Sequence, residues 1–233
     1  MHTPQLSPIN KSLIIAAVAL FLIESIVRLS LGTSLTPFLG LSLPGLLSGW
    51  VTQFLSYPFA ETQLIAVIFN GLILWFLGSE CEWSFGPRRY LLFVLGTLFI
   101  CAVGFLGVSV VVETRASLLG LSALTSSLCI AYAAMYPDRN FSFMMLFPMK
   151  AWMFCGLMIA IILYQGAFQS SLAQSVGQLM SMAYAWFFVR SIRGESLFPF
   201  LKGLNLRSKK HNGSKSHLKL VKKDEEEPPK YWH

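Results

Sequence analysis

Six apolar segments, each about as long as a helix that crosses a membrane, dominate the sequence. They run through residues 12–31, 57–78, 90–112, 116–136, 147–164 and 168–189. A helix needs about 20 apolar residues to span a hydrocarbon core about 30 Å thick. With 55% hydrophobic and only 12% charged residues, the chain is also too apolar for a soluble domain. We therefore expect an all-α membrane protein, a bundle of six transmembrane helices.

The positions of the basic residues predict the orientation of this bundle. With six spans both termini share one side of the membrane, and loops rich in Lys and Arg remain cytoplasmic. The basic residues on the side of the termini are Lys11, Arg88, Arg89, Arg139, Lys150 and those of the C-terminal tail, whereas Arg28 and Arg115 fall near the other side. We expect both termini in the cytoplasm. Compact loops, and four cysteines without disulfide-like spacing, fit a bacterial inner membrane and leave an organelle membrane open.

The C-terminal segment, residues 193–233, differs in composition from the membrane domain predicted for residues 1–192. Eleven of the 18 Lys and Arg residues lie from Arg190 onward, so the net charge of +7 describes this tail and not a surface for nucleic acid. Its low hydrophobicity predicts disorder. Residues 207–223 hold seven basic residues and no acid, and each can contribute about 1 kcal/mol of attraction to anionic lipid head groups. A solvated tail that only fixes the topology is the alternative.

The stretch between the first two spans, residues 32–56, is apolar but cannot form a transmembrane helix. Five helix breakers interrupt it: Pro37, Gly40, Pro44, Gly45 and Gly49. Irregular backbone at membrane depth survives only where protein buries it or at the interface. We expect a loop partly immersed in the outer leaflet, with Trp50 and Tyr57 as interfacial anchors.

Polar and small residues of the second span predict where it packs. Asn70 must find a hydrogen-bond partner in hydrocarbon, so it should face the bundle. Gly78, Glu82 and Gly86 recur every four residues and share one helical face. This pattern predicts a close neighbouring helix and a structural carboxyl at Glu82 that accepts hydrogen bonds from backbone or from a nearby arginine.

The fourth and sixth spans carry a second set of small residues. Gly120-Leu121-Ser122-Ala123 stands near the start of the fourth span, where a serine between small residues is either a packing residue or a nucleophile. In the sixth span Ala173, Gly177 and Ser181 form a stripe that permits tight helix contact. The neighbouring glutamines, Gln174 and Gln178, must face protein.

Together these features resemble the rhomboid family of intramembrane serine proteases over roughly residues 40–189. The matching features are the immersed loop, Phe69-Asn70, the Gly78 to Gly86 pattern, the G-x-S of Gly120 to Ser122, and the helix end at Tyr136-Pro137. The resemblance implies a six-helix core that hydrolyses peptide bonds within the membrane. It also implies that a serine on the fourth helix attacks and that a histidine on the sixth is the general base. The serine N–H, with an asparagine and a histidine of the second helix, then binds the oxyanion.

Carried over residue by residue, the resemblance keeps the nucleophile and loses the base. Ser122 matches the nucleophile and Asn70 the oxyanion asparagine. The sixth-helix pattern A-H-x-x-G-x-x-x-G aligns with residues 173–181, which puts Gln174 at the base position. Three more positions depart from the family pattern: Ala66 for the oxyanion histidine, Ala123 for the glycine after the serine, and Ser126 for the aromatic residue one turn later.

Nothing inside the spans replaces the missing base. The histidines are His2, His211, His217 and His233, all outside the apolar region. A serine hydroxyl needs a proton acceptor to react, and a glutamine side chain does not take up a proton near pH 7. Lys150 is roughly 20 Å from Ser122 along the membrane normal, at about 1.5 Å rise per residue. Removing the base of a serine protease costs on the order of 10⁶-fold in rate.

The sequence supports two function hypotheses and leaves a third. The first is a rhomboid-like pseudoprotease that binds transmembrane segments of other proteins without cleaving them, with no metal or cofactor. The second is an active serine endopeptidase with Ser122 as nucleophile and an unconventional or partner-supplied base. The third, a small transporter, needs ionisable residues along a path. The acids near the spans lie mostly at segment ends: Glu24, Glu61, Glu80, Glu82 and Glu113.

Overall fold

The computed structural model describes residues 6–112, 116–136, 140–143, 147–168 and 172–193. These residues belong to one compact unit, Met1–Leu197. The predicted tail, residues 193–233, lies outside the described residues apart from Arg193. Its disorder and its attraction to lipid therefore stay predictions.

Each predicted span corresponds to one long helical segment in the described part of the chain. The segments are α1 (Pro8–Leu31), the continuous run of α5 (Leu64–Ile73), π-helical η2 (Leu74–Gly78) and α6 (Ser79–Phe85), α7 (Pro87–Val112), α8 (Ser122–Met135), α9 (Ala151–Phe168) and α10 (Leu172–Ile192). The first three segments are long and apolar enough to cross a membrane, and α8 and most of α9 are shorter apolar helices. The fold is thus the predicted helical membrane bundle.

The fourth span starts later than predicted. The apolar run begins at residue 116, but α8 begins at Ser122. The residues before it are not helical, and Leu118 forms an antiparallel β-bridge with Leu41 of the loop after α1. Pairing with this loop satisfies the backbone of Leu118, so the segment before Ser122 does not need to be helical.

The fifth span also starts later than predicted, because a short hairpin precedes it. Strand β1 (Asn140–Phe143) pairs antiparallel with β2 (Phe147–Lys150), and α9 begins only at Ala151. Pairing in this hairpin satisfies backbone groups of residues 147–150, so this stretch does not need to be helical. Hydrophobicity alone therefore placed the start of this helix one turn too early.

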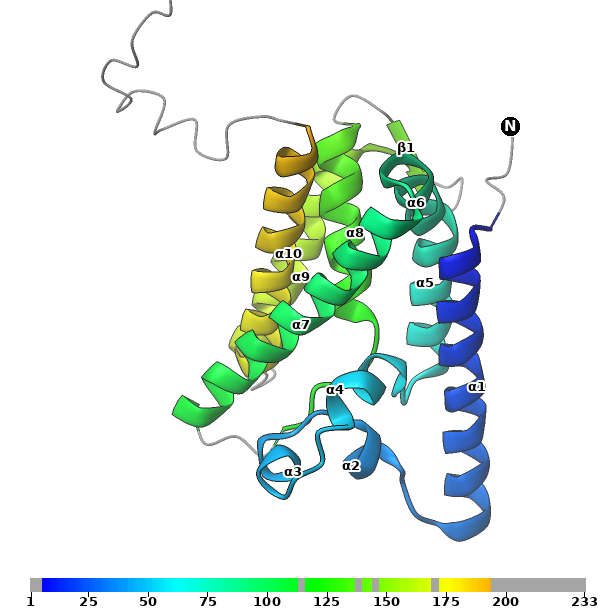
Figure 1. Cartoon of the computed structure of the whole chain (residues 1–233), viewed down its shortest axis with the longest axis vertical. Coiled ribbons are helices and arrows are strands. Elements are labelled where there is room, and N and C mark those ends of the chain that lie inside the picture. The colour runs from blue at the N-terminus through cyan, green and yellow to red at the C-terminus, as the bar shows by residue number, and fades with distance from the viewer. Residues whose placement is uncertain (1–5, 113–115, 137–139, 144–146, 169–171, 194–233) are drawn as a thin grey trace, which may run out of the picture. The chain divides into compact units, whose positions relative to one another are not determined.

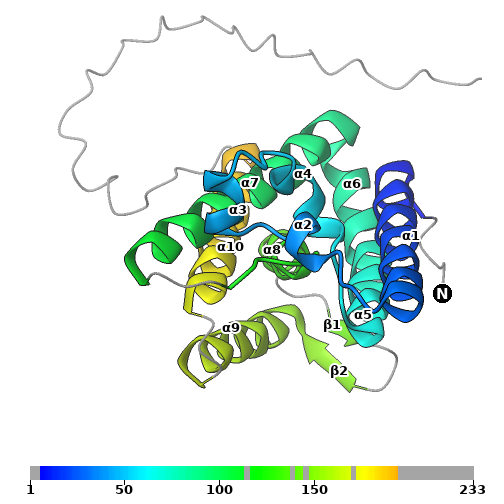
Figure 2. The ribbon, with the colours of Figure 1, turned by 90° about the horizontal axis from the view of Figure 1, so that it is seen from below.

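Helix α8 lies at the centre of the bundle. It packs against α5, α7, α9 and α10, which surround it when the bundle is seen end-on (Figure 2). Ten of its 14 residues are buried. The side chains on nearly every face of α8 must therefore fit against a neighbouring helix. Helix α1 lies at the other side of the bundle from α9 and α10, beside α5 (Figure 1).

The small-residue stripe of α10 lets this helix approach its neighbours closely, as predicted. A Cβ atom at Gly177 would lie 2.7 Å from the carbonyl oxygen of Cys101 on α7. Ser127 Oγ of α8 donates to Ser181 Oγ at 3.1 Å. Ala173, Gly177 and Ser181 are all buried. The stripe therefore fixes α10 against both α7 and α8.

The face of Gly78 and Glu82 packs against the start of α1. Asn10 Nδ2 donates to Glu82 Oε2 at 3.2 Å, and Tyr90 OH donates to Asn10 Oδ1 at 2.6 Å. A Cβ atom at Gly78 would lie 2.7 Å from Asn10 Oδ1. Gly86 ends α6 with a φ of +80°. The Glu82 carboxyl thus accepts hydrogen bonds from the backbone N–H of Ile9 and from the side chain of Asn10, both in α1.

The loop between α1 and α5 is organised around a buried glutamine. It contains α2 (Thr36–Leu39), α3 (Leu43–Leu47), α4 (Gln53–Ser56) and the 3-10 turn η1 (Tyr57–Phe59). Gln53 is fully buried. Its side chain accepts from the Ser42 N–H at 3.2 Å and donates to the Pro37 carbonyl at 3.1 Å. These bonds satisfy backbone groups of the predicted irregular loop.

Only one of the two predicted interfacial anchors lies at the surface. Trp50 is 43% exposed, as an anchor requires. Tyr57 is fully buried, and its hydroxyl donates to the Leu98 carbonyl of α7 at 2.7 Å. The prediction for Tyr57 is wrong, because the residue joins the loop to α7. Immersion of the loop in the outer leaflet stays a prediction.

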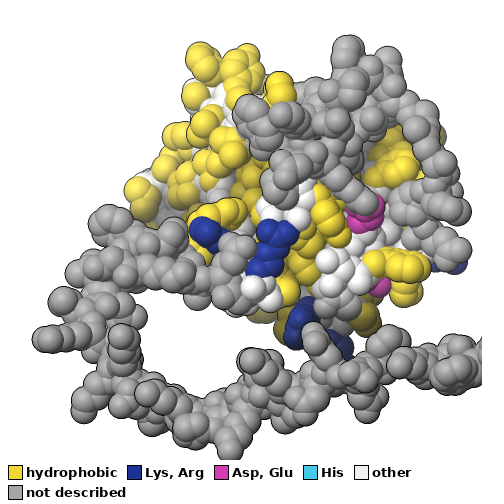
Figure 3. All heavy atoms as spheres, turned by 90° about the horizontal axis from the view of Figure 1, so that it is seen from above, with side chains coloured by type: hydrophobic (Ala, Val, Ile, Leu, Met, Phe, Trp, Pro, Cys, Tyr) yellow, Lys and Arg dark blue, Asp and Glu magenta, His cyan; other side chains and the backbone are white. Residues whose placement is uncertain are grey.

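Basic side chains gather at the end of the bundle where α1 begins and α10 ends (Figure 3). The exposed ones are Lys11, Arg88, Arg89 and Arg193. Arg190 lies 4.5 Å above the ring of Trp186. This end of the bundle is the one that the sequence assigns to the cytoplasm.

Replacing Tyr90 by Phe is expected to lower the unfolding free energy by about 1–3 kcal/mol, because it leaves the buried Asn10 Oδ1 without its donor. Unfolding by SDS in mixed micelles, followed by circular dichroism, measures this loss. Tyr164→Phe is the matched control, since Tyr164 is 57% exposed. Equal losses in the two variants would contradict the structural role of the Asn10–Tyr90 bond.

Candidate functional site

Ser122 is the first residue of α8, and its position depends on Gly120. Gly120 has a φ of +82°, a conformation that other residues rarely adopt. A side chain at this position would also clash with the Glu61 carboxyl. The Gly120 N–H donates to the Tyr57 carbonyl at 2.9 Å. The turn into α8 therefore requires glycine and is bonded to the loop that precedes α5.

The Ser122 hydroxyl is hydrogen-bonded to a glutamine of α10. Gln178 Nε2 donates to Ser122 Oγ at 2.8 Å. Because an amide nitrogen is a donor only, this contact uses the serine oxygen as an acceptor and cannot remove its proton. An activated serine needs a proton acceptor at hydrogen-bond distance.

Gln174, predicted to occupy the vacated base position opposite Ser122, bonds elsewhere. Its Nε2 donates to the Ser117 carbonyl, in the segment before α8, at 2.8 Å. Gln178 follows four residues later, about 6 Å further along the same face of α10, and reaches Ser122 instead. The glutamine that contacts the candidate nucleophile is therefore Gln178. The alignment of Gln174 with the histidine of the family pattern stays a prediction from the motif.

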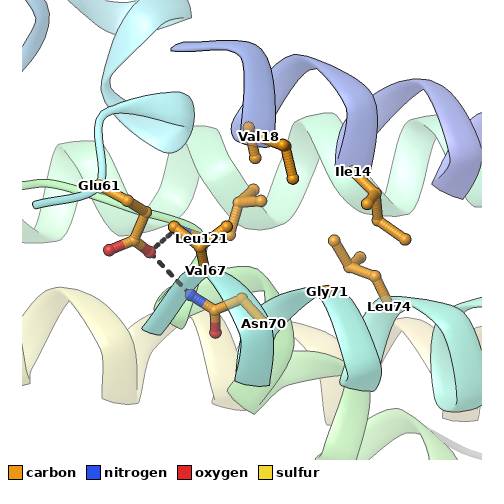
Figure 4. A pocket seen from close by; sticks show the side chains of 9 residues that line it. Ile14, Val18, Glu61, Val67, Asn70, Gly71, Leu74 and Leu121 are labelled. Carbon is orange, nitrogen blue, oxygen red and sulfur yellow. Dashed lines mark hydrogen bonds between the residues drawn. The ribbon is translucent and has the colours of Figure 1, made fainter. Parts of the chain in front are cut away.

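Asn70 is buried and faces the bundle, as predicted, but its amide already has partners. Asn70 Nδ2 donates to Glu61 Oε1 at 2.7 Å, and Thr125 Oγ1 of α8 donates to Asn70 Oδ1 at 3.0 Å. The N–H of Leu121 donates to the same Glu61 oxygen at 3.2 Å (Figure 4). The Glu61 carboxyl thus bridges Asn70, the residue predicted to bind the oxyanion, and the turn that precedes Ser122.

The Glu61 carboxyl is half-buried in the segment between η1 and α5. Burial raises the pKa of this carboxyl above its ordinary value, and the hydrogen bonds from Leu121 and Asn70 oppose that rise. A small crevice of about 10 Å³ beside α1 and α5 is lined in part by this carboxyl. Apart from Glu61 and Asn70 its lining is apolar (Figure 4).

The remaining positions that depart from the family pattern contribute no reactive group. Ala66 replaces a histidine with a methyl group, and Ser126 Oγ donates to the Ala123 carbonyl of its own helix at 3.1 Å. Within the described residues no three His, Cys, Asp or Glu side chains are placed to hold a metal ion.

Sequence reasoning missed the roles of Glu61, Thr125 and Gln178. Gln178 carried a usable signal, since it lies four residues after Gln174 and so shares its helical face. Glu61 carried none, because no local pattern shows that the residue lies next to Leu121, 60 residues later in the chain.

The chain was compared with known protein families and with curated proteins. A family model described as Rhomboid domain matches residues 48–191, more than half of the chain. The chain belongs to the rhomboid family. The match begins in the loop after α1 and ends in α10, so this rhomboid domain includes Glu61, Asn70, Ser122 and Gln178. None of the curated proteins compared with this rhomboid gives a match.

A double-mutant cycle in this rhomboid tests which glutamine contacts the serine. Ser122→Ala and Gln178→Ala are expected to couple by about 0.5–1.5 kcal/mol in unfolding free energy, because they remove the two ends of one hydrogen bond. Ser122→Ala with Gln174→Ala is the control pair and should be additive. Coupling to Gln174 in place of Gln178 would contradict the hydrogen bonds described here.

Proposed function

We propose that the protein is a rhomboid pseudoprotease, a membrane protein that binds transmembrane segments of other proteins without cleaving them. The observation that carries the proposal is the hydrogen bond from Gln178 Nε2 to Ser122 Oγ. Ser122 has an amide donor where a nucleophile needs a base. Losing the base of a serine protease costs on the order of 10⁶-fold in rate.

The composition of the chain supports the same reading. The four histidines lie at residues 2, 211, 217 and 233, outside every predicted span. The small residues that pack α10 against α7 and α8 remain in place, including Gly177 and Ser181. The chain has kept the contacts of a rhomboid scaffold without an imidazole to activate its serine.

The surface beside α1 and α5 supports the binding part of the proposal. The crevice there offers apolar side chains such as Ile14, Val18 and Val67, with Asn70 and Glu61 as its polar residues. Helices in lipid associate by close packing and by a few hydrogen bonds. A client's transmembrane segment with small or polar residues on one face fits such a surface.

One observation favours the alternative, an active endopeptidase with an unconventional base. Burial raises the pKa of the Glu61 carboxyl, and a carboxyl with a raised pKa is better matched to proton transfer near neutral pH. Glu61 also contacts Leu121, the neighbour of Ser122. However, two N–H groups already occupy Glu61 Oε1, and the Ser122 hydroxyl is bonded to Gln178.

A fluorophosphonate probe and a transmembrane reporter peptide in proteoliposomes discriminate these functions. We expect no labelling of Ser122, and we expect a photo-crosslinker at Val18 to capture the reporter at full length. The Ser122→Ala variant should capture as much reporter as the wild type. Labelling that Ser122→Ala abolishes would contradict the pseudoprotease, and its loss in Glu61→Gln as well would identify Glu61 as the base.

We further propose that both termini face the cytoplasm of a bacterium and that the basic tail attracts anionic lipid. Support comes from the exposed Lys11, Arg88, Arg89 and Arg193 at the end of the bundle where α1 begins, and from the positive-inside rule.

Topology reporters test this orientation. Green fluorescent protein fused after His233 should fluoresce, and alkaline phosphatase at the same position should be inactive, because this phosphatase folds only outside the cytoplasm. Phosphatase inserted at Ser48, in the loop after α1, is the control and should be active. An active C-terminal phosphatase fusion would contradict the orientation.

A further inference from the structure

Two N–H groups beside Ser122 converge on a single oxygen atom. The Leu121 N–H donates to Glu61 Oε1 at 3.2 Å, and Asn70 Nδ2 donates to the same atom at 2.7 Å (Figure 4). One donor is the backbone amide next to the candidate nucleophile, and the other is a buried side-chain amide of α5. Preorganised donors aimed at one oxygen beside a serine are the arrangement that binds the oxyanion in acyl transfer.

Both donors are held in place by further bonds. Thr125 Oγ1 donates to Asn70 Oδ1 at 3.0 Å, which orients the amide so that its nitrogen points to Glu61. The Gly120 N–H, bonded to the Tyr57 carbonyl at 2.9 Å, ties the turn before α8 to the segment that carries Glu61. The absence of a side chain at Gly120 leaves the space that the Glu61 carboxyl fills.

We propose that the Glu61 carboxyl is a built-in occupant of this oxyanion position and closes it to the carbonyl oxygen of any bound transmembrane segment. The protein then binds a transmembrane segment while the carbonyl oxygens of that segment stay out of the oxyanion position. This exclusion would persist even if Ser122 acquired a base. The proposal goes beyond the proposed function, because it concerns the donors around Glu61 and not the activation of Ser122. The two can therefore fail separately.

The first test replaces the occupant with a small molecule. Glu61→Ala leaves both donors and an unfilled space, and formate carries the same carboxyl group on a single carbon. We expect formate to raise the melting temperature of Glu61→Ala in detergent by roughly 3–6 °C at tenfold its dissociation constant. Wild type and Glu61→Gln keep an acceptor oxygen in the position and should not respond. Glu61→Ala/Asn70→Ala lacks one donor and should not respond either, and sodium chloride controls for ionic strength.

The second test asks whether the position opens toward Ser122. When phenylboronic acid reacts, Ser122 Oγ bonds to boron, the hydroxyl proton goes to buffer, and the boron becomes a tetrahedral anion. One boron oxygen then needs the two N–H donors. We expect Glu61→Ala to bind the boronate at least about 10-fold more tightly than wild type, measured by boron NMR, since hydrogen bonds to an anion are of that order. Glu61→Gln should resemble wild type, and Glu61→Ala/Ser122→Ala should form no adduct.

Two results would overturn the proposal. One is a wild-type adduct as stable as that of Glu61→Ala, and the other is a folded Glu61→Ala protein that formate does not stabilise. Recovery of Glu61→Ala only with formate present would support it. If Glu61→Ala is not recovered in either buffer, Glu61→Ser, whose short neutral side chain lacks the carboxyl, replaces it and must give the same two results. Suppose that fluorophosphonate labels wild-type Ser122 and labels Glu61→Ala faster. This result would contradict the proposed function, whereas the proposal for Glu61 would stand.

Discussion

Polar groups inside a bilayer must find their partners within the protein, and the organisation of this rhomboid depends on that constraint. Glu82 binds the start of α1 through Asn10, and Glu24 binds the loop after α1 through the Ser34 hydroxyl and the Leu35 N–H. Gln53 satisfies the backbone of the loop itself. Glu82 of α6 thus holds the start of α1, and Glu24 of α1 holds the loop that follows this helix.

The same constraint determines the chemistry of the candidate site. An active site stabilises a transition state because its donors and its base are free to meet the reacting atoms. Here the groups around the serine are bonded to one another: Gln178 with Ser122, and Leu121 and Asn70 with Glu61. The amide nitrogen that donates to the Ser122 hydroxyl cannot accept the proton of that hydroxyl. The geometry therefore combines a rhomboid scaffold with a site whose polar groups already have partners at rest.

Most of the fold could be predicted from the sequence, because hydropathy and small-residue spacing act locally. The six spans, the α10 stripe and the Glu82 anchor followed from such patterns. The starting residues of α8 and α9 did not follow from such patterns. Leu118 pairs with distant Leu41 before α8, and a hairpin precedes α9. In the candidate site, motifs predicted Ser122 and Asn70. The partner of the serine was displaced by one helical turn, from Gln174 to Gln178, because the motif fixes a helical face and not a height along the helix. Glu61 could not be found, since its neighbours come from two other elements.

We propose, as the central claim, that this rhomboid retains the scaffold without the reaction. Its most direct test is mass spectrometry of a transmembrane reporter incubated with the wild-type protein in proteoliposomes, with Ser122→Ala in parallel. Our account predicts the same trace of reporter fragments in both samples, at the background level of empty liposomes. Fragments with one defined cleavage site, present with wild type and absent with Ser122→Ala, would contradict it.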